Sequence, residues 1–296
     1  LNLGDAGLTS GGSLDGTLSI ADESTVNVRA GMFSISTMEG TSSSAITIGT
    51  AQNAGGLTVG KASLNGANVF LDPAWKDGGN LVSDASIGVF ESFANGAVDG
   101  RFAVGRNSLL VLGDKDSAWA QKAVQDALDN ADLTWGKDSV TAALAIKSSQ
   151  KLSATGALLV DGSLATAPSV TENTATFAGQ SLLVVNAAAA DGEGALQGDG
   201  TSRLSVDGGA KLHIMDVKGS QEYTVTSGFV NDKIEGWQGD DLIVSRLFNA
   251  AVNTDGGKFV VKTEAKRPDE FSQYAIPNIL AAIASGNVNN PDAGSN

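Results

Sequence analysis

Residues 194–229 read GALQGDGTSRLSVDGGAKLHIMDVKGSQEYTVTSGF and contain two short apolar pairs separated by a turn. Leu204 and Val206 flank a serine, and after an Asp-Gly-Gly turn Leu212 and Ile214 flank a histidine. An alternation with a period of two is typical of a β-strand that buries one of its faces. The stretch therefore predicts two short strands joined by a tight corner.

Further copies of this pattern are spread along the chain. Two full copies consist of Leu18, Ile20, Val26 and Val28, and of Phe102, Val104, Leu110 and Leu112. Shorter alternations occur at residues 46–48, 57–59, 69–71, 144–146 and 181–185. Turn-forming pairs such as Asp-Gly and Asn-Gly separate many of them. The chain is thus expected to form a long series of short strands.

Two architectures accommodate many short strands. An Asn-Gly pair, as at Asn65-Gly66, suits a two-residue antiparallel hairpin. However, a hairpin is stable only with longer, well-paired strands. Short strands become stable when each coil of chain stacks on the previous one and pairs with it in parallel, about 4.8 Å away. We therefore expect an all-β parallel β-helix, a solenoid with coils of roughly 20 to 25 residues.

Composition restricts the classes of function. The 296 residues include 37 glycines and only 5% aromatic residues, which suits many turns and small strands. A net charge of −14 without a Lys/Arg cluster excludes nucleic acid and anionic membrane surfaces as partners. The absence of cysteine excludes disulfides, thiolate metal sites and cysteine nucleophiles. Because the chain begins at Leu1 and not at Met, we expect it to be a piece of a longer protein.

Residues 116–131 differ from the rest and predict one short inserted α-helix. Their apolar positions follow the helical period and form one stripe: Ala120, Ala123, Val124, Ala127, Leu128 and Ala131. Asp116 or Ser117 suits the N-cap, and Gly136 lies beyond the end. We expect this helix to pack on the flank of the solenoid, the alternative being a protrusion that binds a partner.

The domain organisation follows from a change in side-chain size. Residues 1–215 form the predicted coils, interrupted by loops at residues 72–80 and 186–200, with a strand near 86–90. Residues 216–270 contain fuller strands and larger side chains, so we expect a C-terminal capping module that covers the open end of the solenoid. Residues 271–296 are expected to form a short helix from about Pro277 and then a flexible tail.

The coils of residues 1–215 and the segments that follow them resemble a known family. Those segments are Gly219–Val225, Trp237, Leu242–Leu247 and Gly257–Val261. Together they resemble the passenger domain of Gram-negative autotransporters (type V secretion), of the kind found in pertactin and in self-associating adhesins. The resemblance covers most of the chain, although the inserted helix is not a standard feature of the family.

The resemblance implies a right-handed parallel β-helix that is exported through the periplasm and the outer membrane to the cell surface. It also implies that the C-terminal segment acts as an autochaperone, which folds first and templates the remaining coils. The partner it implies within the same protein is a C-terminal translocator barrel, which the residues up to Asn296 do not contain.

Two groups of carboxylates are candidate sites. Asp240 and Asp241, beside Trp237, are the best carboxylate pair for glycosidic hydrolysis, but neighbours on an extended chain point to opposite faces and the segment suits a turn. Asp191, Glu193 and Asp199 could surround a calcium ion, but their spacing fits neither an EF-hand nor a calcium-binding nonapeptide, so a solvated acidic loop is the simpler interpretation.

His213 is the only histidine, and its alternation with apolar neighbours predicts that it faces outward at the surface. No G-x-S-x-G motif supplies a nucleophile for it. The four tryptophans, Trp75, Trp119, Trp135 and Trp237, are scattered, and we expect them to cap the solenoid or anchor the helix, the alternative being a platform for a sugar ring. We therefore predict no catalytic residue, no metal ligand and no cofactor.

These inferences combine into one functional hypothesis. We expect a non-catalytic adhesin or stalk at the surface of a Gram-negative cell, whose partner is a protein or glycan on a host or neighbouring cell. Fold alone does not determine function. A carbohydrate-active β-helix enzyme, either a polysaccharide lyase or a hydrolase, is the main alternative, and a phage or surface-layer structural protein is another.

The implied order of folding predicts a gradient of stability along the chain. Residues 216–270 should resist limited proteolysis longer than the amino-terminal coils do, because the template must be stable before the other coils stack on it. Mass spectrometry of the digestion time course measures this order. Greater resistance of the amino-terminal half would refute the templating hypothesis.

Overall fold

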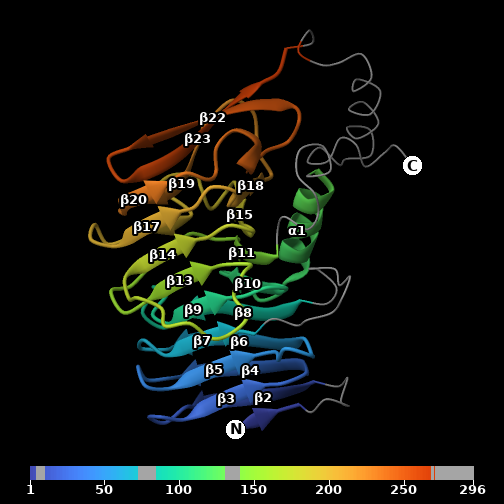
Figure 1. Cartoon of the computed structure of the whole chain (residues 1–296), viewed down its shortest axis with the longest axis vertical. Helices are drawn as coiled ribbons and strands as arrows, with labels where there is room; N and C mark the ends of the chain where they lie inside the picture. Colours follow the sequence, from blue (N-terminus) through green and yellow to red (C-terminus); the bar gives the residue numbers. More distant parts are fainter. Residues whose placement is uncertain (5–10, 73–84, 131–140, 268–269, 271–296) are drawn as a thin grey trace.

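A computed structural model describes residues 1–4, 11–72, 85–130, 141–267 and 270, and it is a parallel β-helix (Figure 1). Each coil passes from one long sheet to the next, and strands of successive coils pair in parallel. The strand β1 (Asn2–Leu3) lies at one end of the stack, and the hairpin of β22 (Phe248–Asp255) and β23 (Lys258–Ala265) lies at the other. The predicted fold class is therefore confirmed.

The strands form three sheets. Sheet A contains, in spatial order, β1 (Asn2–Leu3), β3 (Thr25–Val28), β5 (Ala45–Ile48), β7 (Asn68–Leu71), β9 (Arg101–Val104), β13 (Ala157–Val160), β14 (Thr174–Phe177), β17 (Arg203–Val206) and β20 (Val230–Ile234). Sheet B contains β2 (Gly12–Ser19), β4 (Gly31–Glu39), β6 (Gly55–Ser63), β8 (Ser86–Phe93), β10 (Ser108–Leu112), β11 (Ala142–Ile146), β15 (Ser181–Asn186), β18 (Lys211–Met215) and β21 (Leu242–Ile243). Sheet C contains β12 (Gln150–Lys151), β16 (Leu196–Gln197), β19 (Glu222–Ser227), β23 (Lys258–Ala265) and β22 (Phe248–Asp255).

The core consists of rows of apolar side chains that run along the axis of the solenoid. In sheet A, Val26, Ile46 and Val69 stand directly above one another, because the strands pair in register. In sheet B the corresponding row contains Leu110, Leu144, Leu183 and Leu212, all fully buried. One continuous cluster joins these rows from Ile20 to Val261. The alternation seen in the sequence thus separates the side chains that face this core from those that face outward.

Two insertions interrupt the coils without disturbing either long sheet. The helix α1 (Ala118–Asn130) connects β10 to β11, which are nevertheless adjacent in sheet B and pair over their whole length. Residues 161–173 connect β13 to β14, which are likewise adjacent in sheet A. At the first insertion the chain returns to sheet B without a described strand of sheet A in between, and at the second it returns to sheet A without a described strand of sheet B. Both long sheets contain nine described strands. The inserted helix was predicted at this place, whereas the insertion at residues 161–173 was not.

Helix α1 lies flat against the outward face of sheet B (Figure 1). Its stripe of Ala120, Ala123, Val124, Ala127 and Leu128 is buried in a second apolar cluster. The sheet contributes the outward side chains of β8, β10, β11 and β15, among them Val111, Ala145 and Val184. Small residues on both sides let the helix approach the sheet closely, which agrees with the prediction of a helix packed on the flank. In the described part of the chain, no helix has the length and apolar character needed to span a membrane.

The C-terminal end is closed by large side chains. The ring of Trp237 is fully buried between Phe177 and Phe259, with ring centroids 4.8 and 5.4 Å away. Strands β22 and β23 form an antiparallel hairpin, and β23 pairs with the last parallel strand of sheet C, β19. The antiparallel hairpin therefore ends the parallel stacking and covers the final coil.

Some details of the sequence-based prediction need correction or lie outside the described residues. The predicted loop at residues 186–200 contains β16, whose Leu196 is fully buried between β12 and β19. Strand β8 runs to Phe93, beyond the predicted residues 86–90. Most of the predicted loop at residues 72–80, the helix from about Pro277, the tail, Trp75 and Trp135 fall outside the described residues.

The two faces of strand β5 offer a matched test of this architecture. Ile46 is 1% exposed and belongs to the core row, whereas its neighbour Thr47 faces outward. Ile46→Ala should lower the free energy of unfolding by about 2 to 5 kcal/mol, because it leaves a cavity between two coils. Thr47→Ala should change it by less than about 0.5 kcal/mol. Denaturant unfolding followed by circular dichroism measures both, and equal losses would contradict the assignment of faces.

Candidate functional site

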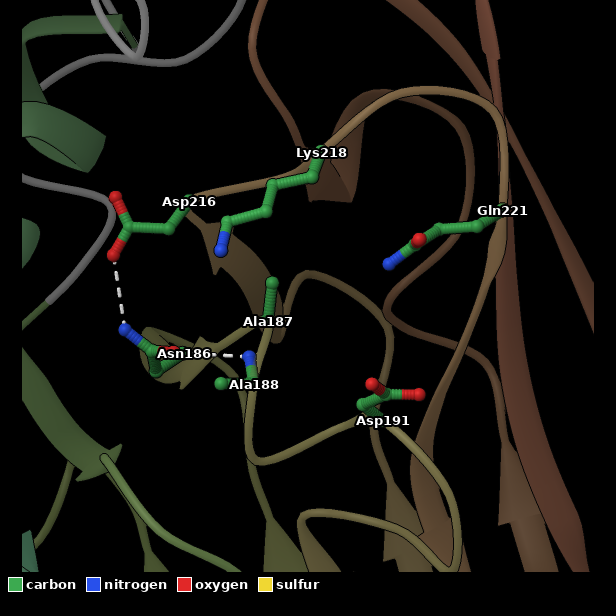
Figure 2. A pocket seen from close by; sticks show the side chains of 7 residues that line it. All are labelled: Asn186, Ala187, Ala188, Asp191, Asp216, Lys218 and Gln221. Atoms are coloured by element: carbon green, nitrogen blue, oxygen red, sulfur yellow. Dashed lines mark hydrogen bonds between the residues drawn. The ribbon is translucent and has the colours of Figure 1, made fainter.

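A polar cleft lies at the corner where the chain leaves sheet B in the last complete coils (Figure 2). Its volume is about 360 Å³. It is lined by Asn186, Ala187, Ala188, Asp191, Asp216, Lys218 and Gln221. The first four residues end or follow β15, and the other three connect β18 to β19. The cleft is therefore formed by two stacked corners of the solenoid.

Parallel register brings these two corners together. Asn186 pairs with Met215 at the ends of β15 and β18, so the residue after Met215 lies next to Asn186. Asp216 has a φ of 60°, a left-handed conformation that aspartate tolerates better than most residues. The Nδ2 amide of Asn186 donates a 2.9 Å hydrogen bond to the carboxylate of Asp216. The Oδ1 atom of Asn186 in turn accepts a 2.9 Å hydrogen bond from the Ala188 amide, which fixes the corner.

The other polar groups approach the cleft from the β18–β19 connection. The backbone amide of Lys218 donates a 2.7 Å hydrogen bond to the hydroxyl of Tyr223, which is fully buried. This contact anchors the connection, and the Lys218 side chain extends over the cleft toward the floor of Ala187 (Figure 2). Asp191 and Gln221 face each other across the other end (Figure 2). Two carboxylates, an ammonium and two amides thus surround a floor of alanine methyl groups.

This arrangement can exchange hydrogen bonds with a ligand that carries several hydroxyl groups. Carboxylates accept, the ammonium donates, and amides do both. The lining thus offers both donors and acceptors to a polar molecule.

The three acidic residues considered as calcium ligands lie in different surroundings. Asp191 lines the cleft, and Glu193 is exposed. Asp199 accepts hydrogen bonds from the backbone amides of Thr201 and Ser202 and from both hydroxyls, which holds its pKa far below the ordinary value. Asp199 thus closes a local turn. Within the described residues no group of three or more His, Cys, Asp or Glu side chains is placed to hold a metal ion.

The two carboxylates considered for hydrolysis also lie in different surroundings. Asp240 and Asp241 lie in a short 3-10 turn, η3 (Gly239–Asp241), where Asp240 is exposed and Asp241 forms an ion pair with Lys211. Lys211 is buried, with 8% of its side chain exposed. The neighbouring Trp237 points into the core and offers no surface for a sugar ring. The turn interpretation of this segment agrees with the structure.

The expectation that His213 lies at the surface is wrong. The ring does point away from the coil core, as its alternation with Leu212 and Ile214 predicts, but only 2% of the residue is exposed. Helix α1 and the apolar cluster beneath it cover this part of sheet B. Burial lowers the pKa of His213 to about 4, and the nearby Asp216 carboxylate opposes this shift only in part.

Trp119 anchors the inserted helix. Its ring packs against the cluster between α1 and sheet B, and the Lys147 ammonium lies 5.7 Å from the ring centroid. This placement agrees with the expectation that the tryptophans cap the solenoid or anchor the helix.

Sequence reasoning missed most of the cleft. Of its polar residues only Asp191 was singled out, and Asp216, Lys218 and Gln221 were not. The signal available in the sequence is the repetition of polar corners after two apolar strands, at Asn186 and Asp216. Which corners stack on one another depends on the register, and the register depends on coil lengths that vary.

Comparison with protein-family models, with curated proteins and with solved structures finds no match for this chain.

The ion pair of Lys211 and Asp241 predicts different consequences for two adjacent carboxylates. Asp241→Ala should destabilise the fold by about 2 kcal/mol, because it removes a carboxylate that pairs with a largely buried ammonium. Asp240→Ala should have an effect below about 0.5 kcal/mol, since this side chain is exposed. Thermal unfolding of the two variants measures the difference. A larger loss in Asp240→Ala would show that the roles are reversed.

Proposed function

We propose that the chain is part of a secreted bacterial surface protein of the autotransporter passenger type and acts as a non-catalytic adhesin or stalk. The observation that supports this most directly is the uninterrupted stacking of nine strands in each of two parallel sheets around one core. Such a body holds its shape along its axis without disulfides, since the chain has no cysteine, and can carry a binding region away from a surface.

The C-terminal end adds support for the resemblance to that family. The segments compared with the autochaperone region include β19, Trp237 and β23. They come together where Trp237 packs against Phe259 and where β23 pairs with β19. A compact end of this kind could fold early and offer its parallel strands as a template, as the proposal requires.

The polar cleft is the proposed contact with the partner. Its carboxylates, amides and ammonium suit the hydroxyl groups of a glycan on a host or neighbouring cell. The net charge of −14 disfavours a strongly acidic polymer, because long-range repulsion would slow its approach. A neutral glycan is therefore the ligand that the cleft suits best.

A carbohydrate-active enzyme is the second candidate function. The observation in its favour is that two carboxylates, Asp191 and Asp216, line one cleft. Glycoside hydrolysis uses two such groups on opposite sides of the scissile bond. However, Asp216 already accepts a hydrogen bond from Asn186, so this carboxylate also holds the corner of the coil in place.

Surface display tests the proposed function. Cells that present the chain should adhere to neutral glycan arrays or to one another. The double variant Asp216→Asn/Lys218→Gln should weaken adhesion at least about tenfold, because it removes two of the polar groups in the cleft. Lys61→Gln, at an exposed position of β6 far from the cleft, is the matched control and should adhere normally.

Other outcomes distinguish the alternatives. Cleavage of a polysaccharide that is lost in both Asp191→Asn and Asp216→Asn would establish the enzyme. If both the cleft variant and the control still adhere, the contact with the partner lies outside the cleft. A stable trimer in light scattering, with neither adhesion nor cleavage, would instead favour a phage or surface-layer structural protein.

A further inference from the structure

The interface between helix α1 and sheet B contains one group that does not suit its surroundings. His213 continues an outward row of the sheet in which Ala145, Val184, His213 and Ile243 stand in register. The other three members of this row are apolar and belong to the cluster that packs under the helix. A titratable ring therefore occupies a position where the interface otherwise presents apolar side chains.

The contacts of the His213 ring suit only its neutral form. The Nε2 atom lies 2.9 Å from the sulfur of Met215, which is a weak partner. The Nδ1 atom is buried and makes no hydrogen bond of normal geometry, although the main chain of Ile243 lies close by. A protonated imidazole needs two hydrogen-bond acceptors, one for each of its N–H groups. This site offers only a weak sulfur acceptor to Nε2 and no acceptor in normal geometry to Nδ1.

The charged groups around the ring come from several elements. From α1, the charge of Lys122 weakly opposes protonation of the ring, and its largely exposed side chain is paired at 2.6 Å with Asp126 on the same helix. On β18, Lys211 occupies the adjacent outward row and pairs with Asp241. Asp216, just after β18, is the group that favours a charge on the ring. The helix itself thus presents a cation that opposes protonation of His213.

The connectivity allows the helix to leave without damage to the solenoid. Strands β10 and β11, which flank α1 in the chain, pair directly with each other in five successive positions. No strand of either long sheet depends on the helix for a backbone partner. The sheet pairings of the described residues include no residue of α1, so a change in the side-chain contacts beneath the helix can shift its position.

We propose that His213 is an acid-sensitive latch that holds α1 on sheet B. With a neutral ring the helix is docked, and with a protonated ring it is released, which uncovers an apolar strip that includes Val111, Ala145 and Val184. The protein would therefore expose this apolar strip only at acidic pH. This inference is independent of the proposed adhesive function.

The direction of the pH dependence follows from the two pKa values of the ring. In the docked state the pKa is about 4, and in the released state it returns toward the ordinary 6.5. The released state therefore binds the proton more readily. Docking is strongest above pH 6.5, weakens by up to about tenfold per pH unit as the pH falls from 6.5 to 4, and changes little further below that.

The single histidine makes a direct test possible. In the full chain, with any affinity tag removed, one imidazole Cε1–H resonance should titrate in the NMR spectrum with a midpoint below 6.5, between the docked value of about 4 and the value of the released ring. Lys122→Gln should move this midpoint slightly upward, because it removes a cation whose charge opposes protonation of the ring. This side chain is largely exposed, so the variant should fold. A wild-type midpoint at 6.5, or one that Lys122→Gln leaves unchanged, would overturn the proposal.

Hydrogen exchange tests the release itself. Amide protection of residues 118–130, corrected for the intrinsic effect of pH, should fall by at least about tenfold between pH 7 and pH 4.5. Strands β13 and β14 on sheet A serve as internal controls and should keep their protection. In His213→Leu, and in His213→Gln should the first variant fold poorly, the protection of α1 should no longer depend on pH. An equal loss of protection in wild type and these variants would assign the effect to other groups and refute the latch.

Discussion

The contact between each inward side chain and the equivalent side chain of the next coil is the constraint on which this fold depends. Hydrogen bonds between parallel strands hold the coils at a fixed spacing, and that spacing is close enough for a leucine to pack on a leucine. The row of Leu110, Leu144, Leu183 and Leu212 illustrates the result. Because every coil repeats the arrangement, a chain with few aromatic residues still forms one continuous core.

The same constraint determines where the chain can vary. An inserted segment is accommodated when the strands on either side of it remain in register, as β10 and β11 do around α1 and as β13 and β14 do around residues 161–173. The outward faces are free of this requirement and can acquire a helix, a polar cleft or a buried histidine. The features with possible functions therefore lie on the corners and flanks, while the core is uniform.

The alternation of small apolar residues was enough to predict the β-helix, and the period of residues 116–131 was enough to predict the helix. Strands β12 and β16 of the third sheet were not predicted, because they have two residues each and two residues carry no period. The burial of His213 could not be seen locally, since the helix that covers it lies some ninety positions earlier in the chain. The cleft depends on which corners stack, and coils of unequal length conceal that register.

The direction of the hydrogen bonds between coils has a mechanical consequence. These bonds lie nearly along the solenoid axis, so tension applied between the two ends loads them lengthwise, one interface at a time. Under load the protein should peel apart by single coils in a series of small, similar steps, unlike a sandwich whose strands shear together. The aromatic contacts of Trp237 with Phe177 and Phe259 would make the last turn the firmest point of attachment.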